Sequence, residues 1–461
     1  MEKILPRSTP SSKHFKNAGE VTYSICPMKN RPSPASFVPQ REKETPLGRF
    51  YATREKTMAL CKPLYVEDFV PRYRHFKSIK WHLGHPTWLV EKLLLRPFAK
   101  KYKPFHEKIE RFFSSLEDLD AGGDFTRPSL DSLISYRNYI DEEISNFMKT
   151  GFESLEEEEM YEFQSILLFI TELEKEAQEE ILTQIKSRFF ECDVRSEYWP
   201  TAEDGSFKCK SSLSPLKWIN FEGGLVNVGA DGREFAFDME MPRHTRYIEP
   251  FEMAQRPVTN GEFLQFVEEG GYERGGLWLS EGWEEIKKNK KNLPKFWKRQ
   301  GGAIKQYTLS GLKPLRLNEP VSHISFYEAE AYARYAKARL PSEFEWEVAS
   351  ESLSLIKGNF FTEGHFHPEP LCDDELRISS HLRAMFGDVW EWTTSLYCPF
   401  PGFQSADVGL WKYTGRLEGS KRVVKGGSCL YDASDFRRTI RKPISIGRDE
   451  YCTGFRLVRS T

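Results

Sequence analysis

Two glutamates could do metal chemistry in the segment LEKEAQEEILTQIK, residues 173–186. Glu176 and Glu180 are four residues apart, so on a helix they share one face and border its apolar stripe. With the imidazole of His85, their carboxylates would resemble a two-carboxylate iron or manganese site. The alternative is that both belong to a solvated, glutamate-rich helix face together with Glu172, Glu174 and Glu179. A single His82 is more often a hydrogen-bonded helix residue than a ligand.

The helix that would carry these carboxylates is predicted from its apolar periodicity. Seven apolar residues form one stripe at 3.6 residues per turn: Phe163, Ile166, Ile170, Leu173, Ala177, Ile181 and Ile185. Three further helical segments precede it, at residues 51–64, 79–98 and 129–150. Ser129 is a suitable N-terminal cap for the third of them. Four helices joined by modest loops indicate an up-down bundle.

The chain divides into four parts. Residues 1–48 are rich in proline and basic residues, so we expect a disordered or loosely docked tail. The helical bundle spans 49–190, and a linker spans 191–212. Residues 213–461 contain short aromatic-rich pieces with frequent glycine and proline, which indicate an irregular α+β domain.

In residues 213–461, short residue patterns predict where helices begin and which side chains form the core. Thr259 with Glu262 and Ser325 with Glu328 have the spacing of capping boxes. Ser342 with Glu345 has the same spacing. Trp346, Trp390 and Trp392 are large rigid side chains that a loop-rich domain needs in its core.

Composition narrows the possible partners and compartments. The 461 residues carry a formal charge of −2 at pH 7, which gives no reason to expect nucleic acid or an anionic membrane. No apolar run is long enough to span a bilayer or to act as a signal peptide, so a cytoplasmic location is expected. The eight cysteines are scattered without a CxxC pair, so we expect reduced packing residues.

Longer motifs carry a family resemblance. Four blocks, RPVTNGEFLQFVEEGGY, PVSHISFYEAEAYARYAKARLPSEFEWEVA, FGDVWEWTTSLYCPFPGF and RVVKGGSC…TGFRL, resemble the formylglycine-generating-enzyme domain, a sulfatase-modifying-factor fold similar to C-type lectins. The helical half, with SIKWHLGHPTWLVEKLLL and TRPSLDSLISYRNYIDEEI, is similar to the DinB-like four-helix bundle of the ergothioneine-pathway sulfoxide synthases, the EgtB family. The resemblance covers roughly residues 50–459.

This resemblance implies a non-heme iron oxidoreductase. In the EgtB family, Fe(II) held by three histidines activates dioxygen, and a thiol, cysteine or γ-glutamylcysteine, is joined to hercynine, the betaine of histidine. His85 matches one ligand. The other two ligand positions match Leu173 and Ala177, which we expect to close the site by packing. Pro86, directly after His85, is expected to kink the helix at a cost of roughly 3 kcal/mol.

The substrate positions also depart from the family pattern. The arginines expected before Thr126 are absent from residues 119–124, which contain two acids. Lys442 stands where the family has an asparagine in the betaine pocket, and an ammonium there would repel a trimethylammonium group. Tyr413 matches the active-site tyrosine that supplies a proton.

The resemblance to the formylglycine-generating-enzyme domain raises two other possible metal sites, one for copper and one for calcium. A copper-dependent formylglycine-generating enzyme needs two cysteines at the positions of Tyr431 and Phe436, so we reject that activity. Related domains hold structural calcium, and the carboxylates of Asp388 and Glu391 are the kind of ligands that calcium prefers.

Two functional hypotheses therefore remain. The first is a divergent oxygenase that uses iron or manganese on His85, Glu176 and Glu180. The second, which we prefer, is a metal-free pseudoenzyme that acts as a binding or scaffold protein, paired with an active homologue as its protein partner.

Overall fold

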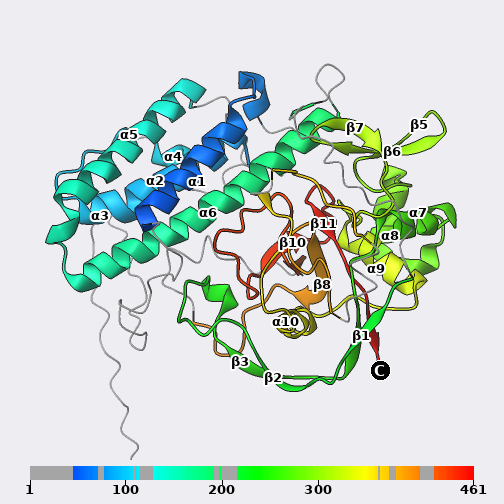
Figure 1. Ribbon diagram of the computed structural model, residues 1–461. Helices are drawn as coiled ribbons and strands as arrows, with labels where there is room; N and C mark the ends of the chain where they lie inside the picture. The colour runs from blue at the N-terminus through cyan, green and yellow to red at the C-terminus, as the bar shows by residue number, and fades with distance from the viewer. Residues whose placement is uncertain are drawn as a thin grey trace, which may run out of the picture.

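The structure joins a helical part to an irregular α+β part (Figure 1). It is a computed structural model, which describes residues 45–70, 77–106, 109–113, 128–191, 197–198, 215–361, 364–372, 381–404 and 420–461. The long helix α6 runs along the helical part and reaches the α+β part, so it contributes to both (Figure 1).

In the helical part, the described residues form four longer helices and several short ones. They are α1 (Pro46–Cys61), α2 (Ile79–Val90), α3 (Arg96–Phe98), α4 (Glu110–Phe113), α5 (Leu130–Thr150) and α6 (Glu157–Phe190), with the single turns η2 (Val66–Phe69), η3 (Glu91–Leu95) and η4 (Phe152–Ser154). The four predicted helical segments are confirmed as helices. Ser129 caps α5 as expected, since its Oγ accepts a hydrogen bond from the Ser132 amide at 3.2 Å.

Helix α6 is the central element of this part, because both α1 and α2 pack against it. Helix α5 packs against α2. The apolar stripe predicted for α6 forms much of the shared core, where Phe163, Ile170 and Ile181 are fully buried. Their burial stabilises the helical part by roughly 2 kcal/mol per side chain.

Proline 86 lies inside α2, where its ring removes one backbone donor. The α-helix nevertheless continues to Val90, and a π-helical turn, η3, follows directly. The expected disturbance is therefore accommodated within one continuous helical run, and His85 stays on a regular helix.

The described residues of the α+β part form four short helices and four small sheets. The helices are α7 (Asn260–Glu268), α8 (Ser280–Asn289), α9 (Phe326–Tyr335) and α10 (Glu343–Glu351), with the turns η5 (Asp238–Glu240) and η6 (Gly275–Leu277). The sheets are β1 (Trp218–Phe221), β4 (Phe251–Ala254) and β12 (Val458–Ser460); β10 (Lys442–Ser445), β9 (Lys421–Lys425), β8 (Trp390–Leu396) and β11 (Thr453–Gly454); β2 (Gly224–Val228) and β3 (His244–Ile248); and β5 (Trp297–Gln300), β6 (Ala303–Thr308) and β7 (Gly311–Pro314).

Strand pairing in these sheets is mostly antiparallel. In the four-stranded sheet, β8 pairs antiparallel with β9 and parallel with β11. This arrangement brings Trp390, at the start of β8, and Lys442, at the start of β10, to the side of the sheet that meets α6. The sheet therefore supplies one boundary of the region between the two parts.

The capping boxes predicted for α7, α9 and α10 are all confirmed. Thr259, Ser325 and Ser342 each accept a hydrogen bond from the backbone of the glutamate three residues later. Trp346, Trp390 and Trp392 are fully buried, as expected for the core of a loop-rich domain.

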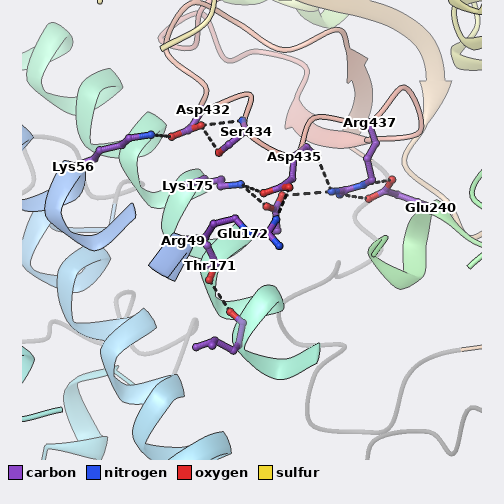
Figure 2. Close-up of polar contacts among 11 residues, drawn as sticks. Arg49, Lys56, Thr171, Glu172, Lys175, Glu240, Asp432, Ser434, Asp435 and Arg437 are labelled. Atoms are coloured by element: carbon purple, nitrogen blue, oxygen red, sulfur yellow. Dashed lines mark hydrogen bonds and ion pairs between the residues drawn. The ribbon is translucent and has the colours of Figure 1, made fainter. Parts of the chain in front are cut away.

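A network of charged side chains joins the two parts (Figure 2). Asp435, in the loop after β9, pairs with Arg49 of α1 and Lys175 of α6, both at 2.8 Å. Lys175 also pairs with Glu172, which lies 3.5 Å from Arg437. These partly desolvated pairs specify how the loop docks on the helices.

Two predicted boundaries fall mostly outside the described residues. Helix α1 begins at Pro46, inside the segment predicted as a tail, whereas residues 1–44 are outside the described part. Most of the predicted linker, 191–212, is outside it as well. Among the described helices, none combines the length and apolar character required to cross a bilayer.

Candidate functional site

A cavity of about 210 Å³ lies where α2, α6 and β10 meet. It is partly open to solvent. Its lining residues are Trp81, His82, His85, Pro86, Leu173, Glu176, Ala177, Glu180, Lys442 and Pro443. The structure therefore brings His85, Glu176 and Glu180 to one cavity, together with Leu173 and Ala177, which the resemblance places at two ligand positions.

Helix α2 supplies an aromatic wall. The His85 ring stacks on Trp81 with centroids 4.2 Å apart, and His85 Nδ1 lies 2.6 Å from the Phe113 carbonyl oxygen. Because a carbonyl only accepts, Nδ1 carries the proton. Burial lowers the pKa of His85 to about 4 and that of His82 to about 3, so both imidazoles are neutral at neutral pH.

Helix α6 supplies the opposite wall through Leu173 and Ala177. Ala177 is buried and Leu173 is half-buried, and neither has an atom that can bind a metal. Contrary to expectation, they do not close the site, because the cavity remains beside them.

The glutamates of α6 do not form the solvated face that the charge run suggested. Glu172, Glu174 and Glu179 are buried, with Glu174 paired to Arg137 and Glu172 to Lys175. The solvated-face alternative is wrong for these three residues because α6 is covered by the helical part on one side and by the α+β part on another.

Glu179 fixes the boundary between α6 and the α+β part. Its Oε1 accepts hydrogen bonds from Trp390 Nε1 at 2.8 Å and from Ser428 Oγ at 2.5 Å. Its Oε2 pairs with the ammonium of Lys442, which also lies 5.5 Å from the Trp390 ring and 5.4 Å from the Tyr451 ring. Lys442 therefore reaches the cavity as part of a fixed ion pair.

Glu176 and Glu180 face the cavity with perturbed acidity. Burial raises the pKa of Glu176 to about 7, and repulsion from Glu172, Glu180 and Glu179 adds to this while Lys442 opposes it. Burial likewise raises the pKa of Glu180. Tyr451 donates a hydrogen bond to Glu180 Oε2 at 3.1 Å, which favours the ionised form.

The raised pKa of Glu176 predicts a pH-dependent stability. The folded state holds this proton more tightly than the unfolded chain, whose value is near 4.5. The stabilisation from Glu176 is therefore complete below pH 4.5 and is lost as pH rises through about 7. Glu176→Gln should lose less stability than wild type between pH 5 and pH 8, as measured by urea unfolding at each pH. Equal losses in the two proteins would contradict the assignment.

The described residues do not fit an iron ion held by three histidines. His85 is present, but the positions matched to the other two ligands hold Leu173 and Ala177. Within the described ranges, no three His, Cys, Asp or Glu side chains are grouped so that they could hold one metal ion. Glu176, Glu180 and His85 share the cavity lining without forming such a group.

The residues considered for calcium have protein partners. Asp388 Oδ1 accepts hydrogen bonds from Asn359 Nδ2 at 2.9 Å and from the Glu369 amide at 2.8 Å, and burial raises its pKa to about 7. Glu391 binds the Arg456 guanidinium with both oxygens, at 2.6 and 2.7 Å. The calcium prediction gains no support from these contacts.

Two predicted features lie outside the described residues. Tyr413 is one, and the segment 119–124, from which the family's thiol-binding arginines are missing, is the other. Sequence reasoning also missed two features within the described part. Trp81 precedes His85 by four residues, a spacing that could have indicated their stacking. The cysteines were expected to be scattered packing residues, yet Cys429 Sγ lies 3.7 Å from Cys452 Sγ.

The comparisons with known proteins define the family of the second part. The model of the sulfatase-modifying factor enzyme 1-like domain matches residues 206–370 and 377–461. The chain therefore belongs to this family, with a helical first part and a C-type-lectin-like second part.

The curated relatives give a narrower similarity. The chain is 32% identical over 251 residues to the hercynine oxygenase of Mycobacterium tuberculosis, covering 50% of this chain and 58% of that protein. It is 31% identical over 257 residues to the hercynine oxygenase of Mycolicibacterium smegmatis, covering 51% and 59%. Ergothioneine biosynthesis protein 1 of Schizosaccharomyces pombe is 27% identical over 237 residues, covering 49% of this chain and 28% of that protein.

These similarities confirm the resemblance to the EgtB family. The match is partial, because the chain spans somewhat under three fifths of the length of the two hercynine oxygenases.

Proposed function

We propose that this protein is a hercynine-oxygenase-like pseudoenzyme that binds a small molecule in the cavity between α2 and α6 without catalysing sulfoxide synthesis. The helical part would be a DinB-like bundle that has kept the cavity and lost the iron ligands. One observation carries the proposal: Leu173 and Ala177 line the cavity at the positions matched to two ligand histidines.

The contacts around the cavity support loss of the ancestral reaction. The Leu173 and Ala177 side chains offer only carbon to a metal, which leaves His85 as the one matched imidazole. Lys442 stands where the family pattern has the asparagine of the betaine pocket, and its ammonium is paired with Glu179, so the contact of that asparagine with hercynine is lost. Metal binding and betaine binding are therefore both impaired.

A second candidate is an active oxygenase with a rearranged metal site. Its supporting observation is that His85, Glu176 and Glu180 line one cavity. Two carboxylates and one imidazole could hold iron or manganese if the side chains moved to enclose the ion. In that case the chain would act on a thiol and hercynine, or on related substrates, with dioxygen.

Metal content and oxygen consumption separate the two candidates. The full chain would be reconstituted anaerobically with Fe(II) or Mn(II), desalted and analysed for metal, in parallel with the His85→Ala variant. We expect well under one ion per chain, and no oxygen consumption with hercynine plus cysteine or γ-glutamylcysteine. Stoichiometric metal that is lost in His85→Ala, together with oxygen consumption, would establish the second candidate and overturn the first.

A further inference from the structure

Glu176 and Glu180 differ in the hydrogen bonds that other residues donate to their carboxyl groups. Glu180 accepts a hydrogen bond from Tyr451 OH at 3.1 Å. For Glu176, the described part of the chain supplies neither a hydrogen bond nor an ion pair, although its carboxyl group lines the cavity. A half-buried carboxylate of this kind is stabilised when a donor from a ligand reaches it.

The side chains that line the cavity include more acidic than basic groups. Glu176 and Glu180 line the cavity from α6, and Lys442 is the cation among the lining residues. Outside the lining, Lys77 lies 5.3 Å from the Trp81 ring, and the charge of Arg448 lowers the pKa of Glu180, which burial raises. The Lys442 ammonium is already paired with Glu179 and packed over Trp390 and Tyr451. Because the Lys442 ammonium is taken up by Glu179, a negative charge remains at the α6 wall when Glu176 and Glu180 are ionised.

The rest of the cavity suits an apolar or aromatic group. Trp81, Pro86, Leu173, Ala177 and Pro443 contribute carbon surface. The volume of about 210 Å³ exceeds the roughly 150 Å³ of an engineered protein cavity that holds benzene. One ring with a short side chain would therefore fit, with the indole of Trp81 available for stacking.

The acceptor oxygens distinguish between kinds of cation. An ammonium that carries N–H bonds can donate to Glu176 and Glu180 together, because residues four apart on a helix are neighbours. Charge-assisted hydrogen bonds of this type are about twice as strong as neutral ones. A quaternary ammonium has no N–H to donate, so it would leave the oxygens unsatisfied.

We propose that the cavity binds a small organic ammonium ion bearing N–H bonds, with the ammonium between Glu176 and Glu180 and an apolar group against Trp81. This inference rests on the proposed binding function and specifies the class of its ligand. The described residues group no three ligands for a metal ion, so an organic cation matches the cavity better than a metal does.

Calorimetric titration of the full chain with three matched probes tests the proposal. Benzylamine carries N–H donors, benzyltrimethylammonium has the same ring and charge without them, and benzoate has the opposite charge. We expect benzylamine to bind more tightly than benzyltrimethylammonium by about tenfold, and benzoate not to bind. Equal binding of the two cations, preference for benzoate, or no binding of benzylamine would overturn the proposal.

Variants locate the site. Glu176→Gln keeps the side-chain shape and should weaken benzylamine binding by about tenfold or more. Glu158→Gln, on an exposed part of the same helix, should leave it unchanged. Equal affinity in Glu176→Gln and wild type would refute the assignment. Oxygen consumption with hercynine and a thiol would overturn the proposed function, whereas absent benzylamine binding in a protein without such activity would overturn this inference alone.

Discussion

Replacing Glu391 by alanine is expected to lower the free energy of unfolding by about 3–5 kcal/mol. Both carboxylate oxygens bind the Arg456 guanidinium, and Oε2 also accepts a hydrogen bond from Trp346 Nε1 at 2.8 Å. Arg456 is fully buried, so removing its carboxylate leaves a charge in the core without a counter-ion. Urea unfolding followed by tryptophan fluorescence would measure the loss.

An exposed pair provides the matched control. Glu330 and Arg334 are four residues apart on α9 and approach to 3.6 Å with partly exposed side chains. Glu330→Ala should change stability by at most about 0.5 kcal/mol. Similar losses in both variants would show that burial does not govern the Glu391 pair. Because the Arg456 guanidinium takes up both carboxylate oxygens of Glu391, we expect EDTA to leave the wild-type unfolding midpoint unchanged.

Local order in this fold could be read from the sequence because it depends on neighbouring residues. The α6 stripe from Phe163 to Ile185 and the capping boxes at Thr259, Ser325 and Ser342 all appeared where expected. Each depends on side chains within a few positions along one helix. The family of the second part could be recognised as well, since its motifs are long.

The burial of charged side chains by distant parts of the chain could not be predicted from the sequence. Glu172, Glu174 and Glu179 have the sequence pattern of an exposed face, yet partners far along the chain pair with each of them. Only the docking of the α+β part on α6 brings Arg437 and Lys442 to that surface. Periodicity describes one helix and carries no information about what covers its second side.

The cavity itself was also beyond sequence reasoning. The apolar types of Leu173 and Ala177 predicted filled space, since apolar residues on a buried stripe normally pack. Whether space remains depends on the separation of α2 and α6, which Trp81, His85 and Pro86 on the facing wall help to set. The space depends on how α2, α6 and β10 pack together, and these elements are far apart in the sequence.

Restoring two histidines is expected to convert the cavity into an iron site. The double variant Leu173→His and Ala177→His would place two imidazoles one turn apart on α6, facing the cavity that His85 already lines. Three neutral imidazoles form a site for Fe(II) with positions left open for other ligands. After anaerobic reconstitution and desalting, iron should rise from well below one to about one per chain by elemental analysis.

Stability measurements strengthen this test because metal binding is linked to folding. Without metal, each new imidazole costs about 1–3 kcal/mol if it lacks a partner in the cavity, so the apo variant should unfold earlier than wild type. Fe(II) should then raise the unfolding midpoint of the double variant and leave that of wild type unchanged. Adding His85→Ala removes the third ligand and should abolish both the bound iron and the shift. If the triple variant kept its iron, the metal would be held elsewhere, and the cavity between α2 and α6 would not be the remnant of a three-histidine site.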